Sequence, residues 1–306
     1  MKFSLNSFFM FTIVLPFISI SSQASEGDAF KARMFQYKEV MHEFDDAVNA
    51  RLQTALDKVN KKNAKNSHLS CTKEELLDVI GKKFRRPVVG IFEFWAVHSS
   101  DIPGHYVPLK KSIYQDLTLK ENLPVHTGKL GMATFYQIND VLVASDKFGH
   151  FFDEGWTYYK ILKSGGSLVD AMNKGIELES GIYGLERSQV FSYGDLAANR
   201  AGLEFWKRIA DEREDSYLKC DKGQWSIKNR FSFKPYVNAA WDEGINCSRY
   251  TNESITKRVN KRIKEFQEQS GLNLSCPIES DKCAELKKYY GDEAKYILNP
   301  LCLNAN

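Results

Sequence analysis

The chain has 306 residues, and its 42 lysines and arginines nearly balance its 39 aspartates and glutamates, which gives a formal net charge of +3. The basic residues form no stripe interleaved with aromatic side chains, which argues against a nucleic-acid-binding protein. A net charge this small does not indicate the sign of a substrate. No segment beyond the N-terminal region reaches the roughly 18 to 20 apolar residues that a membrane-spanning helix needs.

Residues 1–24 are typical of a secretion signal. Lys2 precedes an apolar run, and Ser22 and Ala24 supply small side chains before the predicted cut. We therefore expect a mature chain that begins at Ser25 and is periplasmic or secreted, with no transmembrane segment left. No cysteine follows the cut, which argues against a lipid anchor. The alternative is an uncleaved N-terminal anchor.

The first part of the mature chain, residues 25–70, predicts a helical arm and a linker. Apolar residues recur at helical spacing from Phe30 to Val59, which predicts a long amphipathic helix that packs on the main domain or, alternatively, on a coiled-coil partner. The polar run 61–70 predicts the linker. Thr72 and Glu75 then predict a capping box for a helix that ends near Lys83.

Residues 71–215 predict a central helical domain with a small β element. Residues 87–129, with a β-branched and aromatic run at 88–97 and proline and glycine after it, favour short strands or extended loops, whereas 132–159 favours helix. Gly165 and Gly166 break that helix, and Ser167 caps the next one, which ends near Glu179. A turn at 181–184 and a helix over 195–210 follow.

Residues 216–306 predict a disulfide-stabilised C-terminal extension with one or two hairpins and a basic helix near 254–269. An even number of cysteines in an exported chain, without a C-x-x-C pair, favours disulfides over zinc or redox chemistry. The six cysteines are Cys71, Cys220, Cys247, Cys276, Cys283 and Cys302. Six cysteines allow fifteen pairings, so the sequence does not fix the connectivity; the pairs that we expect are Cys220–Cys247 and Cys276–Cys283. The expected fold is mainly α, in the α+β class.

Asp146, His150 and Glu154 follow one another at i, i+4 and i+8, which places them on one stripe of a helix with aromatic surroundings. Asp146 and His150 can then bond directly and fix the imidazole tautomer. A buried structural network is the alternative role for this pair.

Glu179 ends an apolar helical stripe, where desolvation and the helix macrodipole both raise the pKa of a carboxyl group. Such a group suits a general acid; alternatively, its oxygens accept amides from the turn that follows. Asp195 is a candidate second carboxylate, or a residue favoured by the first turn of its helix. Ser192, Tyr193 and Asn199 flank Asp195 as candidate supporting or substrate-binding residues.

Two family resemblances rest on these residues. Glu179-Ser180-Gly181, with the Tyr-Gly turn that follows, resembles the catalytic helix end of the lysozyme and lytic transglycosylase superfamily. This resemblance implies an exported enzyme that cleaves cell-wall glycan, with Glu179 as the acid. The run Asp146-Lys147-x-x-His150, followed by Asp195 and Asn199, resembles VanZ-like envelope proteins, most of which are embedded in the membrane.

The leading hypothesis is therefore a lysozyme-like glycosidase of the cell envelope that acts on peptidoglycan through Glu179 and Asp195, without a metal or cofactor. One alternative is a non-enzymatic envelope-associated protein. Another is a metal-dependent hydrolase that uses Asp146, His150, Glu179 and Asp195, although no H-E-x-x-H motif is present. Carboxylate geometry separates them: two acids about 5 to 10 Å apart across an open groove favour the glycosidase. A convergent cluster that includes His150 favours metal, and a closed site favours a structural role.

Overall fold

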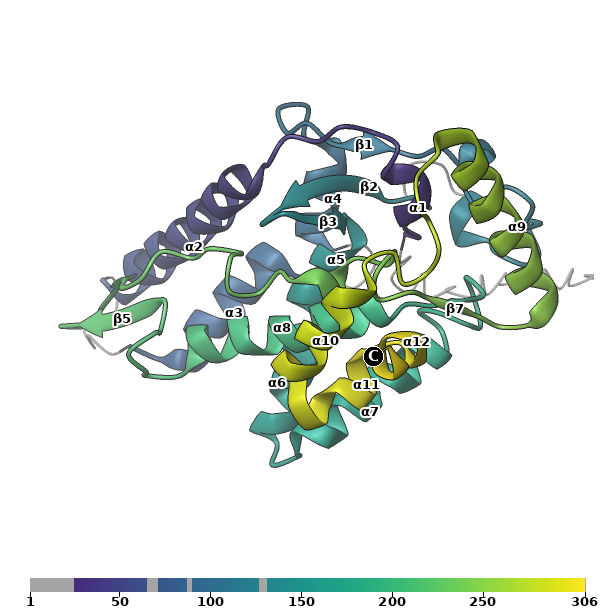
Figure 1. The fold of residues 1–306 in the computed structure, drawn as a ribbon. Helices are drawn as coiled ribbons and strands as arrows, with labels where there is room; N and C mark the ends of the chain where they lie inside the picture. Colours follow the sequence, from purple (N-terminus) through teal and green to yellow (C-terminus); the bar gives the residue numbers. More distant parts are fainter. Residues whose placement is uncertain (1–24, 65–70, 87–89, 127–130, 306) are drawn as a thin grey trace, which may run out of the picture.

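The computed structural model describes residues 25–64, 71–86, 90–126 and 131–305. The predicted signal sequence and most of the predicted linker lie outside these residues. Within them the protein is mainly α-helical with a small β element, as the sequence predicts (Figure 1). None of the described helices is long and apolar enough to cross a bilayer.

The N-terminal arm contains two helices, α1 (Ala29–Ala32) and α2 (Met41–Asn63), instead of the predicted single one. The prediction of a continuous helix is wrong because the connection pairs with a strand. The Val40 amide donates to the carbonyl of Gln137, and the Glu39 carboxylate accepts the amides of Asn139 and Asp140. These bonds hold the connection extended.

The first part of the helix predicted over 132–159 forms two strands of a three-stranded antiparallel sheet instead. Its strands β1 (His105–Tyr106), β2 (Thr134–Ile138) and β3 (Val141–Ala144) lie in the order β1-β2-β3. Asn139 and Asp140 turn the chain between β2 and β3 with positive φ angles, the conformation that a two-residue hairpin loop requires. The helical prediction for 134–144 is therefore wrong.

Helices build most of the centre of the molecule. They are α3 (Lys73–Phe84), α4 (Ile91–His98), α5 (Asp146–Gly149), the π-helical turn η4 (His150–Glu154), α6 (Gly155–Lys163), α7 (Leu168–Ser180) and α8 (Tyr193–Ala210). The predictions for α3, α7 and α8 are confirmed, as is the Ser167 cap of α7, which forms a capping box with Asp170. The capping box predicted from Thr72 and Glu75 is wrong, because Thr72 makes no side-chain cap to α3. The prediction of strands or loops over 87–129 is wrong for Ile91–His98, which forms α4, whereas β1 and irregular segments follow from residue 99 as predicted. Phe92 and Ala96, one turn apart on α4, are fully buried. Packing of this face in the core therefore determines that the segment is helical.

The C-terminal part adds two small β ladders and further helices. The strands are β4 (Val190–Phe191), β5 (Leu218–Asp221), β6 (Gln224–Ile227) and β7 (Arg249–Tyr250), paired as β4-β7 and β5-β6. The α-helices are α9 (Glu253–Ser270), α10 (Ser280–Tyr290), α11 (Ala294–Ile297) and α12 (Pro300–Asn304). Short 3-10 turns lie at η1 (Leu109–Lys111), η2 (Pro124–His126), η5 (Ala239–Trp241) and η6 (Gly291–Glu293).

Three disulfides form, Cys71–Cys220, Cys247–Cys276 and Cys283–Cys302, which is consistent with an exported protein. The pairings Cys220–Cys247 and Cys276–Cys283 suggested by the sequence are wrong. Asn60 of α2 explains the first difference, because its side chain bonds both the amide and the carbonyl of Trp225. This contact holds the β5-β6 hairpin, which carries Cys220, against the helices near Cys71 (Figure 1).

The main hydrophobic cluster includes residues from Val40 to Cys302, so all three parts of the mature chain contribute to it. Its centre is aromatic: Phe44 stacks on Phe148, and Phe151 contacts Phe233 and Trp241. Helices α6 and α8 cross closely beside this centre, where Gly155 and Gly202 face each other. The crossing fixes the position of η4 relative to α8.

We predict that Gly202→Ala destabilises the protein by about 1 to 3 kcal/mol or more, the usual cost of overpacking. A Cβ at this position would collide with the Phe151 carbonyl and lie 3.0 Å from the Cα of Gly155. Urea unfolding measures the loss. Gly81→Ala on α3 is the matched control, because its new Cβ meets nothing but the flexible end of Arg85, at 3.1 Å. Equal effects of the two substitutions would contradict the role of the crossing.

Candidate functional site

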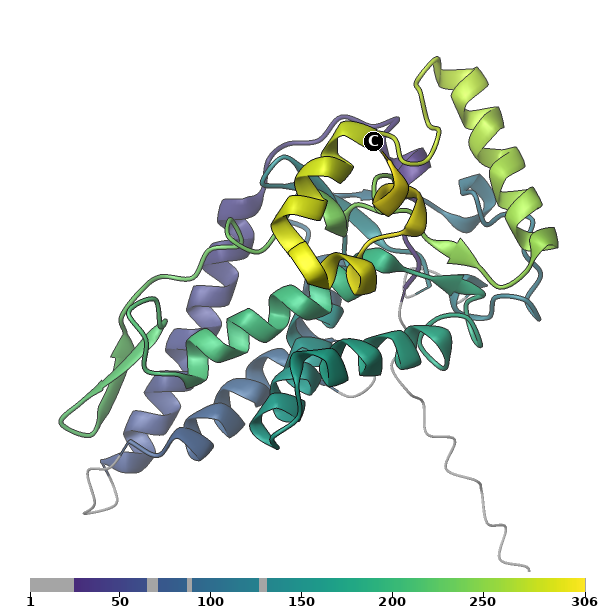
Figure 2. The same cartoon turned by 60° about the horizontal axis from the view of Figure 1, so that its bottom comes forward.

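Three elements bring their polar side chains together beside the aromatic centre. The turn η4 supplies His150, the last turn of α7 supplies Glu179, and the first turn of α8 supplies Asp195. Helices α6, α7 and α8 lie side by side in both overall views (Figures 1 and 2). A π-helical turn inside an α-helix is uncommon and often marks a functional site.

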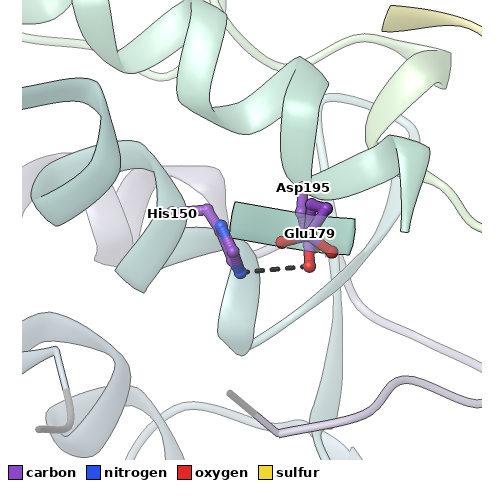
Figure 3. Close-up of side chains that lie close together, drawn as sticks. All are labelled: His150, Glu179 and Asp195. Carbon is purple, nitrogen blue, oxygen red and sulfur yellow. Dashed lines mark ion pairs between the residues drawn. The ribbon is translucent and has the colours of Figure 1, made fainter. Parts of the chain in front are cut away.

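His150, Glu179 and Asp195 converge on one point. The Nε2 atom of His150 lies 3.0 Å from an Asp195 carboxylate oxygen, and Glu179 lies alongside (Figure 3). One ligand atom from each of the three residues lies within 4.8 Å of the others. All three side chains are buried, and Glu179 is 2 % exposed. The arrangement is therefore a compact cluster, not a pair of acids that face each other across an open groove.

Ser192 connects Glu179 to the start of α8. Its hydroxyl caps the helix by accepting the Asp195 amide, and its own amide donates to Glu179 at 3.4 Å. The Glu179 carboxyl group thus contacts the residue that begins α8, and not the turn at 181–184. The hydroxyl of Ser192 also donates to Glu243 at 2.7 Å.

Lys147 is the centre of a second cluster, which shares Asp195 with the first. Its ammonium group lies 2.7 Å from Asp146, 2.6 Å from Asp195 and 2.7 Å from Glu243. The lysine side chain is 0 % exposed. An ion pair buried to this degree gains its stability from close contacts that offset the loss of hydration. Removal of the ammonium group would leave three buried carboxylates without their shared cation.

Burial and mutual repulsion determine the charges in the two clusters. Burial raises the pKa of Glu179 to about 8, and the negative charge of Asp195 acts in the same direction. Burial likewise raises the pKa of Glu243 to about 7, although Lys147 opposes the shift. Burial disfavours charge on His150, but the adjacent Asp195 carboxylate outweighs this effect and raises the imidazole pKa. In Asp195, burial is outweighed by His150 and Lys147, which lower the pKa of its carboxyl group. Four carboxyl groups thus share two basic side chains, so bound protons or a further cation must balance the excess negative charge.

Asn199 lies on the far side of the imidazole ring. Its side-chain amide nitrogen donates to Nδ1 of His150 at 3.1 Å and to the main-chain carbonyl of Asp195, one turn back along α8. In the neutral imidazole Nδ1 is then the acceptor, and Nε2 carries the proton that points to Asp195. This contact fixes the tautomer and the orientation of the ring.

A small cavity of about 20 Å³ adjoins the cluster on the side of His150. Its lining includes Glu93, Asp146, His150, Asp153 and Glu154. A cavity of this size holds one water molecule or ion. One carboxylate oxygen of Asp146 is buried and has no hydrogen-bond partner among the described residues, which leaves it available to an occupant of the cavity.

A larger groove of about 720 Å³ lies next to the small cavity. Asp153, Glu154 and Tyr183 line both, so the two spaces adjoin. Basic and acidic side chains line the groove in similar numbers, together with three aromatic ones, and the guanidinium of Arg85 lies 4.6 Å from the centre of the Trp156 ring. The small cavity beside the cluster thus adjoins a polar, partly aromatic groove.

The structure places the residues predicted from the sequence in three different settings. His150, Glu179, Asp195, Ser192 and Asn199 come together in the first cluster. Asp146 contacts Lys147 instead of His150, so the predicted direct bond within that pair does not form. Glu154 lines the groove, and Tyr193 faces another cavity, of about 360 Å³.

The sequence analysis missed Glu243 and the central position of Lys147. Glu243 lies in a non-helical segment after Trp241, where no periodicity indicates burial. Lys147 appeared only within a family motif, although a lysine between buried aromatic positions in a helical pattern is itself unusual.

The cluster can move a proton, hold a cation, or do both. Glu179 can donate a proton near neutral pH, whereas His150 and Asp195 form a charged pair. The nitrogen and carboxylate donors also suit a divalent transition metal. No protein-family model, curated protein or solved structure matches the chain, so the assignment rests on this geometry.

We predict that Lys147→Met destabilises the protein by about 3 to 5 kcal/mol, because it removes the cation from three buried carboxylates. Urea unfolding of the purified variant measures the loss. Lys82→Met is the matched control, since Lys82 forms a single exposed pair with Asp78 and its removal should cost less than about 1 kcal/mol. A Lys147 variant as stable as the control would show that the buried cluster does not depend on its ammonium group.

Proposed function

We propose that the protein is a metal-dependent hydrolase of the cell envelope, with a divalent cation held by His150, Glu179 and Asp195. The convergence of one nitrogen and two carboxylate donors within 4.8 Å carries the proposal. This is the arrangement that distinguishes a metal centre from a glycosidase with two separated acids. The three disulfides agree with a protein that acts outside the cytoplasm.

The charges of the cluster support a cation at this position. Four buried carboxyl groups share Lys147 and His150. With all four ionised and His150 neutral, three negative charges remain beside Lys147, and a divalent ion would balance two of them in place of protons on Glu179 and His150. Imidazole with two carboxylates favours Zn²⁺ or Mn²⁺ over Ca²⁺ and Mg²⁺, which prefer oxygen ligands alone. Asn199 would fix the orientation of the imidazole ring through Nδ1, and Asp146 lines the adjoining cavity.

The surroundings of the cluster support hydrolysis of a polar substrate. The small cavity has room for one water beside His150, and the groove can accept an extended polar molecule such as cell-wall glycan. A divalent ion in a hydrolase lowers the pKa of a bound water and polarises the bond to be cleaved. Without the ion, His150 and Asp195 share a proton across their 3.0 Å contact, and a bound ion would take the place of that proton. Lys147 would hold Asp195 in place.

The glycosidase predicted from the sequence is the second candidate. The observation in its favour is Glu179, whose pKa of about 8 keeps the carboxyl group protonated at neutral pH, as a general acid requires. Asp195 would then be the assisting carboxylate. The convergence of both acids on His150 favours the metal centre instead, whereas their burial agrees with the structural role that a closed site predicts.

Metal analysis of protein purified without chelator tests the proposal. We expect about one Zn²⁺ or Mn²⁺ per chain, and an at least tenfold weaker affinity in His150→Gln and Glu179→Gln, each of which loses a ligand atom. Glu177→Gln is the matched control on the same helix, because Glu177 is exposed and pairs with Lys174. His42→Gln is the corresponding control for histidine, since His42 lies on the surface of α2.

Activity separates the two candidates. The protein is incubated with peptidoglycan, and soluble muropeptides are measured before and after chelation. Loss on chelation and recovery with Zn²⁺ or Mn²⁺ supports the metal-dependent hydrolase. The glycosidase would replace the metal-dependent hydrolase if metal-free protein released muropeptides undiminished and Glu179→Gln lowered that release about a hundredfold or more. Failure of metal-free protein to bind either ion would also overturn it.

A further inference from the structure

The first residues after the predicted signal sequence are fixed inside the protein. Ser25 is 4 % exposed and its hydroxyl donates to the carboxylate of Glu93 at 2.7 Å. The next residue, Glu26, forms a parallel bridge with Met132: its amide donates to the carbonyl of Gly131, and its carbonyl accepts the amide of Ala133. The carbonyl of Gly27 accepts a bond from the hydroxyl of Tyr114. The segment therefore has one defined path from its first residue onward.

This path leads into the acidic network around the candidate site. A Cβ on Gly27 would lie 2.9 Å from a carboxylate oxygen of Glu243, the residue that binds Lys147. Glu93 lines the same small cavity as Asp146 and His150. Ser25 thus contacts an acid that lines the cavity beside His150.

Two buried acids on this path lack a basic partner among the described lysines, arginines and histidines. Neither Glu26 nor Glu93 forms a salt bridge within the described part of the chain. Burial raises the pKa of both carboxyl groups, that of Glu93 to about 8, and neighbouring acids of the network add to the effect. A buried carboxylate is normally paired or protonated. The network is therefore short of positive charge where the mature chain is predicted to begin.

We propose that the α-amino group of Ser25, released by removal of residues 1–24, is buried as an ammonium ion that pairs with Glu93 and completes the polar network beside the small cavity. The amino nitrogen is separated from the Ser25 hydroxyl oxygen only by the α- and β-carbons, and that hydroxyl already contacts Glu93. Before the cut, the same nitrogen belongs to an uncharged amide. Signal removal thus supplies the missing cation, and only the processed chain contains the complete network.

This inference rests on the predicted cut after Ala24 and does not require that the protein be a metal-dependent hydrolase. Its tests use stability and amine reactivity, whereas those of the hydrolase use metal content and muropeptide release. Failure of one proposal therefore leaves the other open to its own measurements.

The experiment compares residues 25–306 with the same chain extended by Ala24 alone. Both contain every described residue, and they differ in whether the first amino group lies at Ser25. We expect the equilibrium constant for unfolding to be at least about tenfold smaller for the chain that begins at Ser25, because a buried ion pair is broken by the extension. Glu93→Gln in both chains should remove most of this difference, whereas Glu177→Gln, the exposed control, should preserve it.

An aldehyde reagent selective for N-terminal amines provides a second measurement. We expect the Ser25 amine to react at least tenfold more slowly in native than in denatured protein, and the Ala24 amine to react at similar rates in both. Three results would overturn the proposal: equal stability of the two chains, a difference that persists in Glu93→Gln, or a fully reactive native Ser25 amine. N-terminal sequencing of the exported protein that finds a residue other than Ser25 would also overturn it.

Discussion

The contact of one buried ammonium group with three carboxylates is the constraint on which the centre of this protein depends. Lys147 reaches Asp146, Asp195 and Glu243 from a fully buried position. The three acids come from α5, α8 and the segment after η5, so the lysine joins parts of the chain that hydrophobic packing alone would hold less specifically. Mispositioning any of these parts would expose an unpaired charge to the apolar interior, which is far more costly than the loss of one apolar contact.

The aromatic centre and the acidic network depend on each other. Phe148 and Phe151 are neighbours of Lys147 and His150 in the chain and pack into the main cluster. Their burial keeps water away from the ionised side chains and thereby strengthens the interactions among them. The π-helical turn η4 serves both the aromatic centre and the acidic network, because it directs His150 to Asp195 while Phe151 and Phe152 remain in the core.

Local patterns predicted the parts of the fold that local interactions determine. The Ser167 capping box, the helix that ends at Glu179 and the helix that carries Asp195 follow from periodicity and capping residues. The β2-β3 hairpin was missed because Asn139-Asp140 is a less distinctive turn signal than a glycine-containing pair. The predicted pairing Cys220–Cys247 was wrong because Asn60 and Trp225 bring distant segments together, and sequence spacing does not contain that information. Glu179 and Asp195 were identified as neighbours, whereas Glu243 was not, because its burial depends on tertiary contacts.

The cluster around Lys147 and the cluster around His150 differ in how their negative charge is neutralised. This difference distinguishes a structural cluster from the one that we propose to be functional. Lys147 is fully buried and lines neither the small cavity nor the groove, so its ammonium group acts as a structural cation. His150 lines the cavity, so in the proposed function the positive charge on its side of Asp195 would be exchangeable, either as a proton or as a metal ion. Asp195 contacts both residues. A carboxylate fixed on one side by Lys147 would keep its position when the proton or ion on the other side is exchanged, which would suit catalysis.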